Sequence, residues 1–196
     1  MNFLAHLYLS GDNEETIIGN FIADHVKGNR INKYSEGIIA GIKLHREIDA
    51  FTDNHPMFLS SKTRLQEKYK RYSGVIVDMF YDHFLSANWQ DYIDEDITLF
   101  TNRMYKIVIK RFLILPPKTK IILPFMAKSN WLVAYGTFHG IDKALKGMSG
   151  RTAFDSGMEN AISDLKQDYD KYRKEFQEFF PDITRFSKNR RRELEI

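Results

Sequence analysis

The feature that most restricts the fold of this chain is the recurrence of long segments with apolar residues at every third or fourth position. Ile38, Ile39 and Ile42 show this spacing, whereas strict alternation of apolar and polar residues hardly occurs. An apolar period near 3.6 residues is typical of α-helices, and alternation is typical of strands. The sequence therefore predicts an all-α fold, a single-domain multi-helix bundle over residues 1–196.

The expected helices are separated by turn and stop residues such as Gly28, Pro56 and Gly74. They span about residues 2–9, 14–26, 34–50, 56–72, 75–89, 96–112, 118–129, 131–146 (interrupted at Gly136) and 154–179. The helix over 75–89 is apolar almost all round, so we expect it at the centre of the bundle. Pro181 is expected to close the last helix, and the basic run 188–192 to be solvated or frayed.

Composition excludes several classes of protein and of site. Cysteine is absent, which removes disulfides and thiolate ligands, so a metal site here must use His, Asp, Glu or Asn side chains. The net charge of +3 is too balanced to indicate nucleic-acid binding. The sequence contains neither an apolar run of the roughly 20 residues that cross a bilayer nor a signal peptide at its start. We therefore expect a cytoplasmic protein that binds neither nucleic acid nor membrane.

Three of the expected helices each turn two polar side chains, four positions apart, toward their apolar face. The pairs are Asn20 with Asp24, His45 with Asp49, and Asp78 with Asp82. A carboxylate on a buried face is costly unless it is paired, hydrogen-bonded or bound to a metal, and two carboxylates side by side repel each other. Helical bundles bind Mn²⁺, Mg²⁺ or Fe²⁺ with such side chains converging from neighbouring helices. The joint pattern therefore predicts a metal or catalytic site.

Each of these side chains also has a commoner structural role when it is taken singly. A buried aspartate is more often an ion-pair or capping partner, and Arg46 lies three residues from Asp49. A histidine among apolar neighbours, as His6 is, more often forms a hydrogen bond inside the core. The coincidence of three pairs is what favours a metal site over these roles.

Two expected helices carry basic stripes that suggest an alternative, non-catalytic function. The stripes are Arg64, Lys68 and Arg71 on one helix, and Arg103, Lys106 and Lys110 on another. Such stripes are usually solvated faces, but they also suit docking of acidic proteins, because complementary charge accelerates association. The alternative to an enzyme is thus a helical binding module that docks acidic protein partners, with the inward pairs as a structural network.

Five segments carry a resemblance to a known family. Residues 1–7 (MNFLAHL), 19–24 (GNFIAD), 41–49 (GIKLHREID), 51–56 (FTDNHP) and 81–85 (YDHFL), with Trp89, resemble the bacterial acyl carrier protein phosphodiesterase family. The resemblance implies an HD-domain-like helical fold, since that family is a divergent relative of the HD phosphohydrolases. It also implies an enzyme that uses Mn²⁺ to release 4′-phosphopantetheine from the serine of holo acyl carrier protein. The Asp and His donors also allow Mg²⁺ or Fe²⁺ as alternatives.

The resemblance places the site mainly within residues 1–90, although the adjacent His-Asp doublet of HD proteins is absent here. The helix faces select the metal ligands Asp24, His45, Asp49, Asp78 and Asp82. In metal-assisted hydrolysis of a phosphodiester, the ion lowers the pKa of bound water and neutralises charge on the phosphoryl oxygens. The candidate catalytic residues are Asn20 or Arg46, to hold a phosphate oxygen, and His6, His55 or His83, to protonate the leaving serine oxygen.

Overall fold

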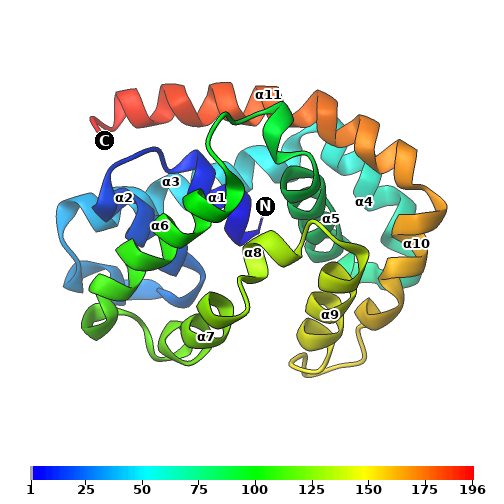
Figure 1. Ribbon diagram of the computed structural model, residues 1–196, viewed down its shortest axis with the longest axis horizontal. Helices are drawn as coiled ribbons and strands as arrows, with labels where there is room; N and C mark the ends of the chain where they lie inside the picture. Colours follow the sequence, from blue (N-terminus) through cyan, green and yellow to red (C-terminus); the bar gives the residue numbers. More distant parts are fainter. Residues whose placement is uncertain (1) are drawn as a thin grey trace.

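A computed structural model describes residues 2–196, which form eleven α-helices with short 3₁₀ turns and no strand (Figure 1). The helices are α1 (Phe3–Leu9), α2 (Glu14–Ile22), α3 (Glu36–Asn54), α4 (Pro56–Tyr69), α5 (Ser73–Ala87), α6 (Ile97–Lys110), α7 (Pro117–Lys128), α8 (Trp131–Ala134), α9 (Phe138–Ser149), α10 (Ala161–Gln167) and α11 (Tyr169–Glu193). The prediction of an all-α protein is confirmed. Among the described residues, no helix is both long and apolar enough to span a membrane.

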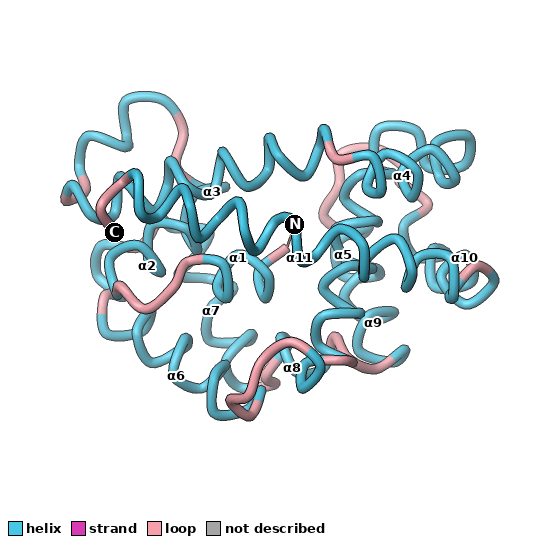
Figure 2. The backbone as a smooth tube through the Cα atoms, turned by 90° about the horizontal axis from the view of Figure 1, so that it is seen from above, coloured by secondary structure: helices cyan, strands magenta, loops and turns pink. Residues whose placement is uncertain are grey.

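Helices α2, α6 and α7 gather at one end of the molecule, and α4, α9 and α10 gather at the other (Figures 1 and 2). Helix α11 runs along one side of the molecule and contacts α1, α3, α4, α5 and α10. Between the two ends lie α1 and α5, whose side chains are buried over most of their length, as the apolar sequence of residues 75–89 predicted for α5. The hydrophobic core extends from Leu4 of α1 to Ile183 of α11.

The prediction of one helix from 154 to 179 closed by Pro181 is wrong. Residues 161–167 form the separate helix α10, and α11 continues through Pro181 to Glu193. An interior proline lacks the amide hydrogen that would bond to the carbonyl four residues earlier, at a cost of about 3 kcal/mol. Burial of Phe179, Phe180 and Ile183 on either side of Pro181 offsets this cost.

The basic run 188–192 is helical and not frayed, although Lys188, Asn189 and Arg192 are exposed to solvent, as the sequence suggested. Arg190 forms an ion pair with Glu47 of α3, with 2.5 Å between Nε and Oε2. Arg191 donates to the carbonyl oxygen of Leu9, and the Ser187 hydroxyl donates to the same oxygen at 2.6 Å. These contacts hold the end of α11 against α1 and α3, which sequence periodicity alone does not reveal.

Helices α2 and α3 cross closely at two glycines, and this crossing sets the positions of the polar pairs that they carry. A Cβ atom on Gly19 would lie 2.1 Å from the carbonyl oxygen of Ile38, and one on Gly41 would lie 2.3 Å from that of Thr16. Both distances are far below van der Waals contact, so only glycine permits this approach. Asn20 and His45 consequently lie within hydrogen-bonding distance of each other.

Candidate metal centre

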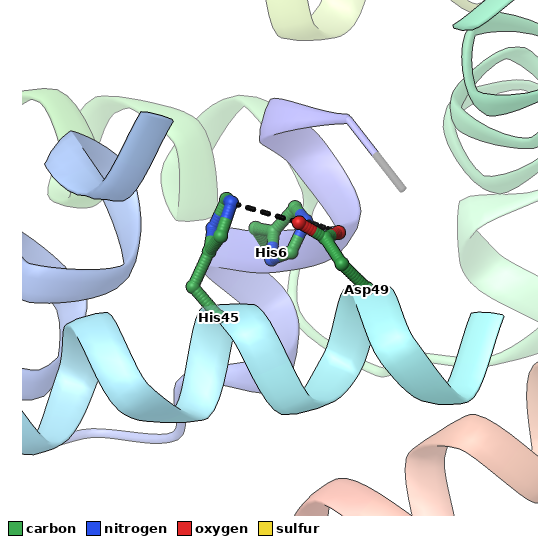
Figure 3. A group of neighbouring side chains, drawn as sticks. All are labelled: His6, His45 and Asp49. Carbon is green, nitrogen blue, oxygen red and sulfur yellow. Dashed lines mark hydrogen bonds and ion pairs between the residues drawn. The ribbon is translucent and has the colours of Figure 1, made fainter. Parts of the chain in front are cut away.

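His45 and Asp49 project from one face of α3 toward His6 of α1 (Figure 3). Nε2 of His45 lies 3.1 Å from Oδ2 of Asp49, and Nε2 of His6 lies 3.1 Å from Oδ1 of the same carboxylate. The two imidazole rings stack with centroids 3.9 Å apart. Both histidines are buried, whereas the Asp49 side chain is 40% exposed, so the group opens toward solvent on its carboxylate side.

Asp24 and Asn20 extend this group from α2 and the turn that follows it. Oδ1 of Asp24 lies 3.4 Å from Nε2 of His45 at an exposed position. Asn20 is buried, and its amide nitrogen donates to the carbonyl oxygen of His6 at 3.0 Å. Its amide oxygen must therefore be the acceptor for Nδ1–H of His45, at 2.9 Å. This bond directs Nε2 of His45 toward Asp24 and Asp49.

Proximity to these carboxylates determines the charge of each histidine. Burial alone would lower the pKa of His45, but its hydrogen bonds to Asp24 and Asp49 outweigh burial and raise the pKa to about 9. Burial, together with the nearby charge of His45, lowers the pKa of His6 to about 4. Burial opposes ionisation of Asp49, yet hydrogen bonds with His45 and His6 hold its pKa well below the ordinary value. In the metal-free protein at neutral pH, a His45 cation thus lies beside two carboxylates.

The donor set at this position fits a divalent metal ion. One nitrogen of each histidine and one oxygen of Asp49 all lie within 4.8 Å of one another; we call these three residues the His6–His45–Asp49 cluster. Two imidazoles and a carboxylate suit Mn²⁺, Fe²⁺ or Zn²⁺, and the Asn20 bond to His45 is the type of outer contact that orients metal-binding histidines. A bound cation would replace the proton of His45, so binding at neutral pH should release protons.

Asp82 lies outside this cluster and hydrogen-bonds to the backbone of α1. Asp82 is fully buried on α5, and its two carboxylate oxygens accept the backbone N–H groups of Leu4 at 2.9 Å and Ala5 at 3.2 Å. These are orphan donors at the N-terminus of α1, so Asp82 acts as a cap supplied by another helix. Burial raises the pKa of Asp82 to about 7, in opposition to these bonds. Asp78, one turn earlier, is half-buried, and burial raises its pKa.

The remaining sequence candidates also lie outside the cluster. His83 hydrogen-bonds through Nδ1 to the carbonyl oxygen of Tyr135 at 2.8 Å, and its Nε2 lies 3.1 Å from the Tyr169 hydroxyl. Arg46 is exposed and donates to the carbonyl oxygen of Val26 at 3.3 Å. His55 accepts the Met57 N–H at the start of α4. His55 also lies 3.4 Å from Asp182 through its Nε2. Catalytic roles for these three residues stay a prediction.

The structure thus brings together residues of the first two polar pairs with His6, which the sequence had assigned to catalysis or to the core. The apolar neighbours of His6 in the sequence do not show which helix its side chain faces, so the sequence could not predict its contact with α3. The one available signal was the presence of His6 in the motif at residues 1–7.

The fold is all-helical, and two buried histidines lie beside the partly exposed carboxylate of Asp49. These features define the class of helical proteins with a candidate metal centre. Comparisons with known proteins define the family. The family model described as acyl carrier protein phosphodiesterase matches residues 1–183. The chain belongs to the acyl carrier protein phosphodiesterase family, which confirms the resemblance seen in the sequence motifs.

Curated relatives with the same name match this chain over nearly their whole lengths. The acyl carrier protein phosphodiesterase of Photorhabdus laumondii subsp. laumondii is 31% identical over 191 residues, covering 97% of this chain and 96% of the relative. That of Serratia proteamaculans is 28% identical, with 97% and 99% covered. That of Yersinia pestis is 29% identical, with 94% and 96% covered. No solved structure matches the chain significantly, so the HD-like fold stays a prediction.

Proposed function

We propose that this protein is a metal-dependent phosphodiester hydrolase that releases 4′-phosphopantetheine from the serine of holo acyl carrier protein. The observation that carries the proposal is the His6–His45–Asp49 cluster, in a chain whose family is named for this activity. We propose Mn²⁺ as the ion, with Mg²⁺ or Fe²⁺ as alternatives. Two imidazoles beside oxygen ligands favour Mn²⁺ or Fe²⁺ over Mg²⁺, which prefers oxygen alone.

His6, His45 and Asp49 would hold the ion, and Asp24 would complete the ligand set on the exposed side. A bound divalent cation supplies a water of lowered pKa and neutralises charge on phosphoryl oxygens. Asn20 has a positioning role, because its bond to Nδ1 of His45 presents Nε2 to the site. Burial of both histidines excludes water from one side of the cluster and leaves the carboxylate side open to substrate.

The proposed reaction consumes one water molecule. The water oxygen forms a bond to phosphorus, the bond between phosphorus and the serine oxygen breaks, and the serine oxygen takes up a proton. The products are apo carrier with a free serine hydroxyl and 4′-phosphopantetheine with a terminal phosphate. Asp24 is exposed, and the hydrogen bond from His45 lowers its pKa, so it is ionised at neutral pH at the open side of the cluster.

Mass spectrometry of the carrier tests this function directly. We expect purified protein with Mn²⁺ to convert holo carrier to apo carrier, and chelator to stop the conversion. Asp49→Asn should abolish turnover and the rise in melting temperature that Mn²⁺ produces. Asp53→Asn is a matched control, because Asp53 is an exposed carboxylate one turn further along α3. If holo carrier stays intact with every divalent ion tried, the proposal is wrong.

A further inference from the structure

A cavity of about 490 Å³ lies among α7, α8, α9 and the start of α1. Its volume falls in the range, about 300–1,000 Å³, that encloses a small organic molecule. Its apolar walls include Phe3, Ile122, Trp131, Ala144 and Met148. Of these five side chains, only the indole of Trp131 can form a hydrogen bond. The walls therefore suit a ligand that is largely uncharged.

One face of α9 forms a wall of this cavity. Its lining residues are His139, Gly140, Lys143, Ala144, Gly147 and Met148, which recur at helical spacing. Gly147 leaves room in this wall, because a Cβ atom added there would have no neighbour within 4 Å. The cavity is therefore shaped in part by the absence of a side chain at position 147.

The charged residues of the cavity are all basic. His139, Lys143 and Arg151 line it and are exposed, and no Asp or Glu is among the lining residues. Within the described part of the chain, none of these three forms an ion pair, whereas most of the basic side chains on α4 and α6 do. The unpaired charges of Lys143 and Arg151 at an apolar cavity favour a ligand that is anionic at one end or is attached to an acidic protein.

Helix α1 connects the cavity to the metal centre. Asn2 and Phe3 line the cavity, and His6 lies three residues beyond Phe3 on the same helix. Residues three apart in a helix are neighbours on its surface. The first turn of α1 therefore borders both the cavity and the cluster.

We propose that this cavity binds the pantetheine arm of the carrier, between the phosphate at the metal centre and the thiol end. This assignment rests on the proposed function, because it takes its occupant from that substrate. The arm is a slender, neutral chain with amide groups, and Asn2, Ser129 and Thr137 supply polar atoms for amides among apolar walls. Lys143 and Arg151 at the cavity face the acidic carrier to which the arm is attached.

Filling the cavity at Gly147 tests the proposal. Gly147→Phe places a large side chain into open space on α9, so the fold and the melting shift produced by Mn²⁺ should be preserved. We expect KM for holo carrier to rise at least tenfold. Gly74→Phe is the matched control, since the only neighbour within 4 Å of a Cβ there is the flexible end of the Lys62 side chain, and it should leave KM unchanged.

A binding assay without turnover separates this proposal from the proposed function. Trp131 lines the cavity, while the only other tryptophan, Trp89, is buried against Tyr8 and Phe100. Titration of metal-free protein with 4′-phosphopantetheine should change tryptophan fluorescence saturably. The fluorescence change should vanish in Trp131→Phe. In Gly147→Phe the apparent Kd for 4′-phosphopantetheine should rise at least tenfold.

The outcomes are distinct. No saturable change, or a change that Gly147→Phe leaves intact, would overturn the cavity assignment even if holo carrier is hydrolysed. An unchanged KM in Gly147→Phe would overturn it as well. If the unmutated protein does not hydrolyse holo carrier, the proposed function fails, and the fluorescence titration alone then decides whether the cavity binds the arm.

Discussion

Asn20 is an uncharged side chain that links two of the residues of the candidate metal centre. Its amide is fixed at one end by the His6 carbonyl and at the other by Nδ1 of His45, so it joins the two helices that supply the histidines. Removal of such an outer contact typically lowers metal affinity by about 10- to 100-fold, because the ligand loses its orientation.

Asn20→Ala should therefore weaken Mn²⁺ binding by about 10- to 100-fold without abolishing it. Loss of the buried hydrogen bonds should also lower stability by about 1–3 kcal/mol. Calorimetric titration measures the first effect and denaturant unfolding the second. Asn54→Ala, at an exposed end of α3, is the control. An affinity equal to that of the unmutated protein would exclude the positioning role.

The two histidines should give the metal-free protein a stability maximum near pH 6.5, their ordinary pKa. The pKa of folded His45, about 9, lies above its ordinary value, so its contribution is complete below pH 6.5 and is lost as the pH rises through 9. The pKa of folded His6, about 4, lies below its ordinary value, so its contribution is lost as the pH falls from 6.5 toward 4.

Melting temperatures in chelator across this range check the expectation. They should fall between pH 6.5 and 9, and His45→Gln should show a smaller fall because it has no proton to lose. Equal slopes in the two proteins would mean that the carboxylates do not hold His45 in its charged form.

At the scale of residues, helical spacing correctly placed His45 and Asp49 on one face of α3, whereas Asp24 lies in the turn after α2 at an exposed position. Sequence spacing predicts the faces of a helix only where the helix continues. It could not decide which face of another helix lies opposite. The pair of Asp78 and Asp82 on α5 shares a face in the same way, yet the structure places the N-terminus of α1 against Asp82. A capping role and a metal role produce the same sequence spacing.

At the scale of elements, α1 depends on Asp82 for two of the backbone donors at its first turn. In an asparagine at this position an NH2 group, which only donates, replaces one of the two accepting oxygens, so one of the two N–H groups loses its partner. An unpaired buried N–H costs about 1–3 kcal/mol. Because α1 carries His6, the capping contact also helps to place one ligand of the candidate metal centre.

Asp82→Asn separates the capping role from the metal role. We expect it to melt at a lower temperature both with and without chelator, and to keep most of the rise that Mn²⁺ produces. A ligand would behave differently, because its loss would remove the rise due to bound ion while the stripped protein would melt near or above the unmutated one. Thermal melts with Mn²⁺ and with chelator decide between the two.

Helix boundaries followed local signals wherever a cap residue was present. Pro56 begins α4, and Thr137 accepts the Gly140 N–H at the start of α9, near the interruption expected at Gly136. The prediction was wrong at Pro181, where tertiary burial of neighbouring aromatic residues outweighs a local stop signal. Local sequence cannot report such burial, because the partners of α11 come from α3, α4 and α5.

At the scale of the whole molecule, the two basic stripes are unequal as docking surfaces for an acidic carrier. In the first, Arg64 pairs with Glu175 at 2.6 Å and Lys68 with Asp164 at 2.7 Å, which ties α4 to α11 and α10. Reversing these charges would remove internal ion pairs. In the second, Lys106 and Lys110 are exposed, and Lys110 has one exposed partner, Glu14, at 3.3 Å. Arg103 of the same stripe pairs with Glu95 at 2.6 Å, so only Lys106 and Lys110 permit charge reversal at little cost in stability.

The double variant Lys106→Glu and Lys110→Glu should therefore raise KM for holo carrier while melting close to the unmutated protein. Rising salt should raise KM in the unmutated protein and less in the variant, because screening acts only on charges that attract. Lys171→Glu with Arg173→Glu changes the net charge equally on the exposed side of α11 and is the control for net charge alone. If both double variants raise KM equally, the attraction belongs to the whole molecule. If neither does, and salt leaves KM unchanged, the carrier does not dock through charge on α6.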